Sequence, residues 1–280
     1  MRSKEETTLR WRRILVAVVA LIVMVCILLV RGTRTKPLEF TTGGEPVAAL
    51  TWIQYDDTYL SELRSEFGID DVVSECKTDF DKVKAITTWV TSLWKHDGRN
   101  TPSAPDPLTI LREASEGQRF RCVEYGIVMA ASLQSLGIPA RMLALKTEDV
   151  ETRESGAGHV CTEVYLWDIE KWVFIDPQWG AIPVLDDVPL NAVEFQQALA
   201  ANDGKLVIWG VAQPQRLVYE RWIGQYLYYF DYSIGGGRQL MLGPVGAPEP
   251  KVFQRTMRLG DIVYTHSVDV FYAPPVRRPD

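Results

Sequence analysis

The chain has 280 residues, of which 46% are hydrophobic and 24% charged, and its formal net charge at pH 7 is −6. These proportions are typical of an ordered globular protein with one sizeable domain or two small ones. They exclude disorder as the main state of the chain.

Near the N-terminus an apolar run of 17 residues, Ile14 to Val30, has about the minimum length of a helix that crosses a bilayer. A cleaved signal peptide, a lipoprotein signal and a buried core helix are the alternatives to a retained anchor. The run passes directly into Arg31 without a small-residue cleavage site, and Cys26 lies deep inside it. We therefore expect a transmembrane helix at residues 14–30.

Basic residues flank this run unequally, which favours an N-terminus inside the cell. Five precede the run (Arg2, Lys4, Arg10, Arg12, Arg13) and three follow it (Arg31, Arg34, Lys36). Residues 1–13 would then be cytoplasmic, residues 31–50 a linker, and the domain after them extracytoplasmic. Residues 37–280 hold 22 basic and 34 acidic side chains, a formal charge of −12, so nucleic acid is not an expected partner.

Three cysteines follow the apolar run: Cys76, Cys122 and Cys161. In an oxidising compartment an odd number leaves at least one thiol unpaired, unless it bonds another chain or all three are simply small buried residues. Cys161 could bond to Cys122 or to Cys76, and both pairings stay open. We expect no cofactor and no metal, because the chain has no CxxC pair, only three histidines and no DxDxDG loop for calcium.

Hydrophobic periodicity and capping residues predict the elements between residues 79 and 176. Helices are expected at 79–95, 106–116 and 122–136. Asp106 would cap the second with Pro107 in its first turn, and Gly137 would end the third. Strands are expected at 141–147, 159–167 and 172–176, the last two joined by the polar turn DIEK.

Farther along, the pattern predicts a helix at 191–201 and β-rich pieces at 206–211 and 261–272. The aromatic segment 219–232 is expected to pack as extra strands, with a substrate-binding surface as the alternative. The three glycines at 235–237 indicate a turn and not a phosphate loop. We expect a core domain at 51–185 and, at 186–280, a C-terminal extension that is mixed with β-rich segments.

Cys122 stands at the start of a predicted helix. Unpaired backbone N–H groups and the helix dipole stabilise negative charge at that end, and a nearby imidazolium would add to the effect. Cys122 is therefore the candidate nucleophile.

His159 begins a strand after a glycine-containing loop, where a side chain can project into a cleft. A catalytic histidine needs an acceptor on its far nitrogen, and Asp176 is the candidate. With Trp167 opposite Trp172 in a hairpin, His159 and Asp176 share one face but are offset along the strands. Either the loop is irregular or the contact is diagonal.

The segments RCVEYGIVMAASLQSLGIPARML and GHVCTEVYLWDIEKWVFIDPQWG place Cys, His and Asp in one order, with an LGIPAR turn, a GH strand start and a W-x-x-x-DP strand end. This set resembles the transglutaminase-like superfamily, of a bacterial, membrane-anchored type, over about residues 80–179. The resemblance implies an α+β, papain-like core in which the helix bearing the cysteine packs on an antiparallel sheet.

The resemblance further implies acyl transfer on protein or peptide amides, with Cys122 as nucleophile, His159 as general acid and base, and Asp176 as the orienting carboxylate. Amine or water would resolve the thioester, so a transglutaminase, a deamidase and a peptidase are all compatible with it. The backbone N–H of Cys122 is one oxyanion donor, and Gln118 is a candidate for another. The alternative is a non-catalytic transglutaminase-like binding module of the cell envelope.

Overall fold

The computed structural model describes residues 35–47, 52 and 54–277, together with residues 11, 12, 14–16 and 18. Two compact units are distinguished, Met1–Lys36 and Pro37–Asp280, and every helix and strand named below belongs to the second. Within the described residues no helix is both long and apolar enough to cross a membrane. The predicted transmembrane helix at 14–30 lies mostly outside the described residues and stays a prediction.

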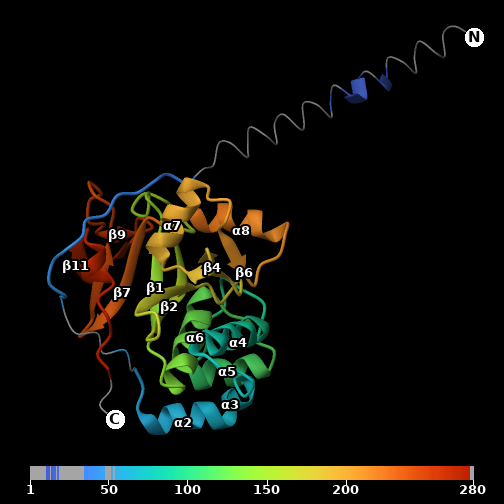
Figure 1. The fold of residues 1–280 in the computed structure, drawn as a ribbon, viewed down its shortest axis with the longest axis vertical. Coiled ribbons are helices and arrows are strands. Elements are labelled where there is room, and N and C mark those ends of the chain that lie inside the picture. The colour runs from blue at the N-terminus through green and yellow to red at the C-terminus, as the bar shows by residue number, and fades with distance from the viewer. Residues whose placement is uncertain are drawn as a thin grey trace, which may run out of the picture. The chain divides into compact units, whose positions relative to one another are not determined.

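Helices come first in the second unit and gather on one side of it (Figure 1). They are α2 (Asp57–Glu66), α3 (Ile69–Val72), α4 (Asp79–Ser92), α5 (Pro107–Ser115) and α6 (Cys122–Ser135). Asp106 caps α5 by accepting the backbone N–H of Thr109 at 3.1 Å, and Gly137 follows α6 with a φ of 75°. The helices predicted at 79–95, 106–116 and 122–136 are confirmed.

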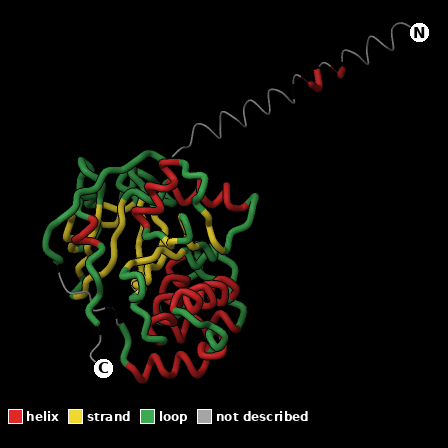
Figure 2. Tube along the Cα trace, in the orientation of Figure 1, coloured by secondary structure: helices red, strands yellow, loops and turns green. Residues whose placement is uncertain are grey.

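A six-stranded sheet in the order β11-β8-β7-β1-β2-β3 lies beside these helices (Figure 2). Its strands are β1 (Ala140–Lys146), β2 (Gly158–Leu166), β3 (Lys171–Ile175), β7 (Tyr229–Gly235), β8 (Arg238–Leu242) and β11 (Asp261–Thr265). Neighbours pair antiparallel except β8 and β11, which are parallel. The predicted α+β class, with the Cys122 helix on a mostly antiparallel sheet, is confirmed.

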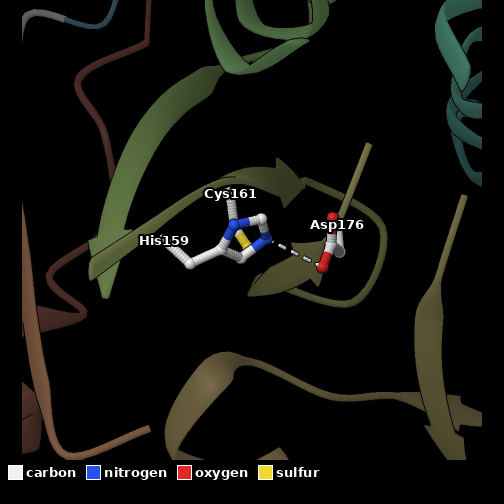
Figure 3. Close-up of side chains that lie close together, drawn as sticks. All are labelled: His159, Cys161 and Asp176. Carbon is white, nitrogen blue, oxygen red and sulfur yellow. Dashed lines mark hydrogen bonds and ion pairs between the residues drawn. The ribbon is translucent and has the colours of Figure 1, made fainter. Parts of the chain in front are cut away.

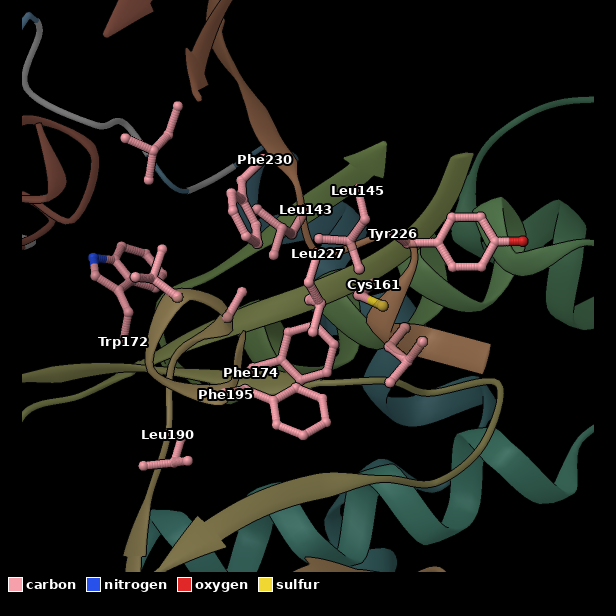
Figure 4. Close-up of a cluster of buried hydrophobic side chains, with 14 of the residues drawn as sticks. Leu143, Leu145, Cys161, Trp172, Phe174, Leu190, Phe195, Tyr226, Leu227 and Phe230 are labelled. Atoms are coloured by element: carbon pink, nitrogen blue, oxygen red, sulfur yellow. The ribbon is translucent and has the colours of Figure 1, made fainter. Parts of the chain in front are cut away.

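Apolar side chains cover both faces of the sheet. Val164 and Ile175 pack toward α6 with Val128 of that helix. Leu143 and Phe174 point to the opposite face, where the core is completed by residues from the second half of the chain (Figure 4). This second core surrounds the strand ends that carry the candidate site.

The remaining elements include a small second sheet and helices that add side chains to the core on one face of the large sheet. A small sheet in the order β5-β4-β6 contains β4 (Ile182–Leu185), β5 (Val188–Pro189) and β6 (Val207–Trp209). The helices here are α7 (Ala192–Ala201), α8 (Gln215–Gly224) and α9 (Val268–Phe271), and β9 (Val252–Phe253) pairs with β10 (Met257–Arg258).

Two predictions in this region are partly wrong. Residues 219–224 end helix α8 instead of forming a strand, because Tyr219 and Ile223, four residues apart, bury one helical face in the core. Residues 268–271 form α9 where a strand was expected to continue, since the Ser267 hydroxyl caps a helix there by accepting from Val270. The strand predictions hold for β7 and β11.

Strands on both sides of the predicted boundary at residue 186 share the large sheet, because β7 pairs with β1. Part of the predicted linker also joins this unit, since Thr41 donates its N–H to His266 at 2.8 Å and accepts from Val268 at 2.9 Å. Residues 39–43 of that segment are therefore hydrogen-bonded to the C-terminal part of the unit.

Two buried ion pairs fix the strands around the site. Lys146 of β1 pairs with Asp231 of β7, and Arg141 of β1 pairs with Glu163 of β2 at 2.6 Å. Tyr272, just after α9, donates its hydroxyl to Glu163 at 3.0 Å. Separating either pair would leave a buried charge without a partner, so each pair opposes rearrangement of its strands.

Candidate active site

Cys122 is the first residue of α6, and its side chain is partly exposed. Arg121 donates its backbone N–H to the Glu124 carboxylate at 3.0 Å, which closes the first turn of the helix. The remaining unpaired N–H groups at this end of α6 favour negative charge, so the position suits a thiolate.

His159 on β2 and Asp176 directly after β3 form a buried hydrogen bond of 3.0 Å between His159 Nε2 and Asp176 Oδ2 (Figure 3). The Cys122 thiol lies close enough to the His159 ring to help raise its pKa. Since Nε2 is engaged by Asp176, Nδ1 is the nitrogen left for the thiol. The structure therefore brings together the three residues that the sequence analysis selected.

Asp176 is held in place by hydrogen bonds of its carboxylate and of its backbone to the turn that follows. Its Oδ1 accepts the N–H groups of Gln178 at 3.1 Å and Trp179 at 3.3 Å. Its backbone N–H and C=O bond to Ala181 at 2.9 and 3.0 Å. A carboxylate fixed in this way can orient an imidazole and select its tautomer.

The hairpin register differs from the predicted one by two residues. Trp172 pairs with Tyr165 and not with Trp167, and the loop spans residues 167–170, where Glu170 has a φ of 49°. Continuing this ladder by one residue places Asp176 opposite Cys161, so His159 is its diagonal neighbour. Of the two possibilities left open by the sequence, the diagonal contact is the one observed.

The pKa of His159 lies well above its ordinary value. Burial by itself would lower it, but the neighbouring Cys161 and Asp176 groups and the hydrogen bond to Asp176 outweigh the burial. Because burial raises the pKa of the Cys161 thiol to about 12, that thiol is neutral at pH 7. Asp176 is therefore the negative charge that keeps His159 protonated.

Cys161 is fully buried in the core cluster beneath His159 (Figures 3 and 4). Cys76, Cys122 and Cys161 are all free thiols, so neither of the two disulfides considered from the sequence is formed. With its thiol neutral and inaccessible, Cys161 is a poor nucleophile. Cys122 has the exposure and the helix-start position that this role requires.

Gly126 lets α6 approach β2 closely. A Cβ atom at this position would lie 3.0 Å from Val160 Cγ1 and 3.4 Å from the Cys161 carbonyl oxygen. Cys122 lies one helical turn before Gly126 on the same face of α6. The close packing at Gly126 therefore positions Cys122 beside the strand that carries His159.

The family model of the transglutaminase-like superfamily matches residues 69–177 of the chain. Residues 69–177 form a transglutaminase-like domain. The matched segment contains Cys122, His159 and Asp176. No curated protein matches the chain.

Several solved structures are distantly similar. A candidate cysteine protease from Cytophaga hutchinsonii is 16% identical with a TM-score of 0.35, over 59% of this chain and 56% of that one. The periplasmic domain of TgpA from Pseudomonas aeruginosa, bound to ethylmercury, is 18% identical with a TM-score of 0.34, over 46% of each chain. This chain thus spans little more than half of the first protein and less than half of the second, and similarity at this level transfers no activity.

Aromatic residues from outside the transglutaminase-like domain cover its candidate site. Trp222 packs edge-on against His159 with ring centroids 4.7 Å apart, and Tyr226 lies 5.9 Å from the same ring. Tyr219 lies with its buried hydroxyl beside Asp176, without a well-formed hydrogen bond. The aromatic segment therefore packs in the core, as expected, and also borders the candidate site.

His96 is a residue near the site that sequence reasoning missed. Burial lowers its pKa, and the positive charge of His159 lowers it further, which places His96 within electrostatic reach of the transglutaminase-like site. It lies on the loop after α4. The only signal in the sequence was a histidine just after a predicted helix, in a loop that nothing tied to Cys122.

Gln118, the candidate second oxyanion donor, lies on an exposed loop before α6. Its Oε1 accepts a hydrogen bond from Asn100 Nδ2 at 3.2 Å. Among the contacts of the described residues, Gln118 has none with Cys122. The backbone N–H of Cys122 remains the donor that the helix start provides.

His159, Cys161 and Asp176 also meet the spacing of a metal site, because one ligand atom from each lies within 4.8 Å of the others. Nitrogen, thiolate and carboxylate together suit Zn²⁺. Binding would require His159 to give up its bond to Asp176 and Cys161 to lose its proton. The residues could hold a metal only at the expense of the hydrogen-bonded arrangement observed.

Proposed function

We propose that this protein is a thiol enzyme that transfers or hydrolyses acyl groups at amide bonds of proteins or peptides. The observation that carries the proposal is the 3.0 Å bond between His159 Nε2 and Asp176 Oδ2, with Cys122 near enough to affect the pKa of the same ring. This arrangement supplies a nucleophile, a proton carrier and an orienting group. Membrane anchoring through residues 14–30, with the enzyme outside the cell, is part of the proposal and rests on the sequence pattern.

In the acylation step the Cys122 thiolate attacks the amide carbon, a C–S bond forms, and the oxyanion is bound by the backbone N–H of Cys122. The C–N bond then breaks, and His159 gives its proton to the leaving ammonia or amine. In the second step His159 takes a proton from water or an amine, which attacks the thioester and releases Cys122. Asp176 keeps the imidazole oriented in both steps.

The choice of acceptor separates the three activities. A glutamine peptide is incubated with the full-length protein, with and without a primary amine, and the products are weighed by mass spectrometry. Amine incorporation indicates transglutamination, a gain of about one dalton deamidation, and shorter products proteolysis. Cys122→Ala should abolish every product, whereas Cys76→Ala, the matched change at another partly exposed thiol, should not.

The alternative, a non-catalytic binding module, is favoured by the near-complete burial of His159 under Trp222 and Tyr226. It predicts that Cys122→Ala leaves the biological role of the protein intact. Enzyme chemistry predicts that the same change removes it.

A further inference from the structure

A polar pocket of about 400 Å³ lies between the loop after α4 and the loop that leads into α6, the helix that begins at Cys122. It is lined by Asp97, Arg99, Asn100, Gly117, Gln118 and Arg119. Arg119 precedes Cys122 by three residues, so the backbones of the two lie within about 10 Å of each other. That distance is about the length of three extended peptide residues.

Hydrogen bonds join the two loops that form the pocket. Asp97 donates its N–H to Phe120 at 2.9 Å, and Asn100 donates its Nδ2 to the Arg119 carbonyl at 2.8 Å. The loop of Asp97 and Asn100 also carries His96, whose pKa is lowered in part by the positive charge of His159. One wall of the pocket therefore leads along the chain into Cys122, and the other wall belongs to the loop that carries His96.

The charges of the pocket are not internally neutralised. Arg99 and Arg119 have no salt bridge among the described residues, and the pocket's single carboxylate, Asp97, accepts the backbone N–H of Arg99 at 3.0 Å. In contrast, seven arginines of this acidic unit pair with a carboxylate, namely Arg64, Arg112, Arg121, Arg141, Arg153, Arg216 and Arg255. Two exposed guanidinium groups at one pocket suit an anionic ligand.

We propose that this pocket binds a carboxylate of the substrate, one to three residues from the amide that Cys122 attacks. The inference rests on the proposed function and specifies its substrate as an acidic peptide. A carboxylate fits because a guanidinium presents paired N–H donors that match its two oxygens. The source is either an Asp or Glu side chain or a free C-terminus.

The test uses full-length protein and glutamine peptides that carry Glu, Ala or Lys one, two or three residues from the glutamine on either side. A second set compares a free C-terminal carboxylate with an amide. At one position Glu should raise kcat/KM about tenfold over Ala, a difference of about 1.4 kcal/mol. If only the C-terminal set shows this gain, the source is the chain end.

The double variant Arg99→Gln, Arg119→Gln should lose the preference for the acidic peptide. The matched control, Arg238→Gln with Arg258→Gln, removes the same charge from exposed positions on β8 and β10 and should keep it. Arg99→Glu with Arg119→Glu should instead favour the Lys peptide. Turnover without any acidic preference, or a preference that survives the first double variant, overturns the inference.

Absence of turnover with every peptide would instead refute the proposed function. The pocket is then tested by fluorescence anisotropy of labelled Glu and Ala peptides with the Cys122→Ala variant. Tighter binding of the Glu peptide that is lost in the Arg99→Gln, Arg119→Gln background supports the pocket, and equal binding of both peptides rules it out.

Discussion

Trp222 packs edge-on against the imidazole of His159, with ring centroids 4.7 Å apart and ring planes at 71°. The contact joins α8, outside the transglutaminase-like domain, to a residue inside it. Because the indole keeps water from the side of the imidazole, the His159–Asp176 hydrogen bond lies in a low-dielectric environment, where it is stronger than in water.

Trp222→Ala should lower kcat about tenfold, equivalent to about 1.4 kcal/mol of transition-state stabilisation, because water can then compete for the His159–Asp176 bond. Trp222→Phe keeps an aromatic cover and should lose much less. Release of ammonia from a glutamine peptide measures both. Equal rates for the Ala variant and the wild type would show that the cover has no part in turnover.

Asp176→Asn should weaken the protein in a pH-dependent way. Since the pKa of His159 is raised in the folded state, the stability from its pairing with Asp176 is fully present below about pH 6.5 and lost as the pH rises through the folded pKa. Urea unfolding should therefore show the largest gap between wild type and Asp176→Asn near pH 6, and a smaller gap at alkaline pH. A gap that widens with pH contradicts the assignment.

The pKa of His96 should lie below the ordinary histidine value, and the pKa of His159 should lie above it. The pKa of His96 is lowered by burial and by the positive charge of His159, so it should rise in a His159→Gln variant. Histidine ring signals followed by NMR across the pH range provide the measurement, with His266→Gln as the control that removes the third histidine. An unchanged His96 titration in His159→Gln would show that the two rings are not coupled.

Cys161→Ala should keep turnover within a fewfold of wild type but cost about 2 kcal/mol of unfolding free energy, because a fully buried side chain is truncated. In the folded wild type, a thiol reagent should label Cys122 and spare Cys161. Intact-mass analysis before and after unfolding counts the thiols. Labelling of Cys161 at the rate of Cys122 would contradict the burial described.

Gly126→Val should destabilise the protein by about 1–3 kcal/mol, because its side chain would collide with Val160 and push α6 away from β2. Alkylation of Cys122 at neutral pH should also slow, since the thiol loses its contact with His159. Val160→Ala should partly restore both properties. Gly204→Val, at a position with no atom within 4 Å, is the matched control and should have little effect.

The parts of the fold that the sequence predicts well are those determined locally. Helix α5 is specified by Asp106 and Pro107 at its start, and Gly137 ends α6, so each boundary follows from two or three residues. The parity of β2 and β3 also follows from alternation alone. His159 and Asp176 could be assigned to one face because the assumed register and the observed one differ by two residues, an even number that keeps each side chain on its face.

What the sequence does not determine depends on contacts between distant residues. The aromatic residues of 219–224 have high strand propensity, and they become helical because Tyr219 and Ile223 meet a core assembled from other strands. The shift of two residues between β2 and β3 depends on the conformation of Glu170. His96 could not be connected to the site because its loop is positioned by a hydrogen bond to Phe120.

The buried pair of Lys146 and Asp231 bears on whether the transglutaminase-like domain can act without the rest of the chain. A fragment that stops at residue 185 retains all three candidate catalytic residues but leaves the Lys146 ammonium without its counter-ion and His159 without Trp222. The same cut removes β7, β8 and β11, so β1 becomes an exposed edge strand and the apolar side chains that these strands cover lose their packing. Mutation or truncation in the last hundred residues should therefore disable the chemistry of residues that lie far upstream of them.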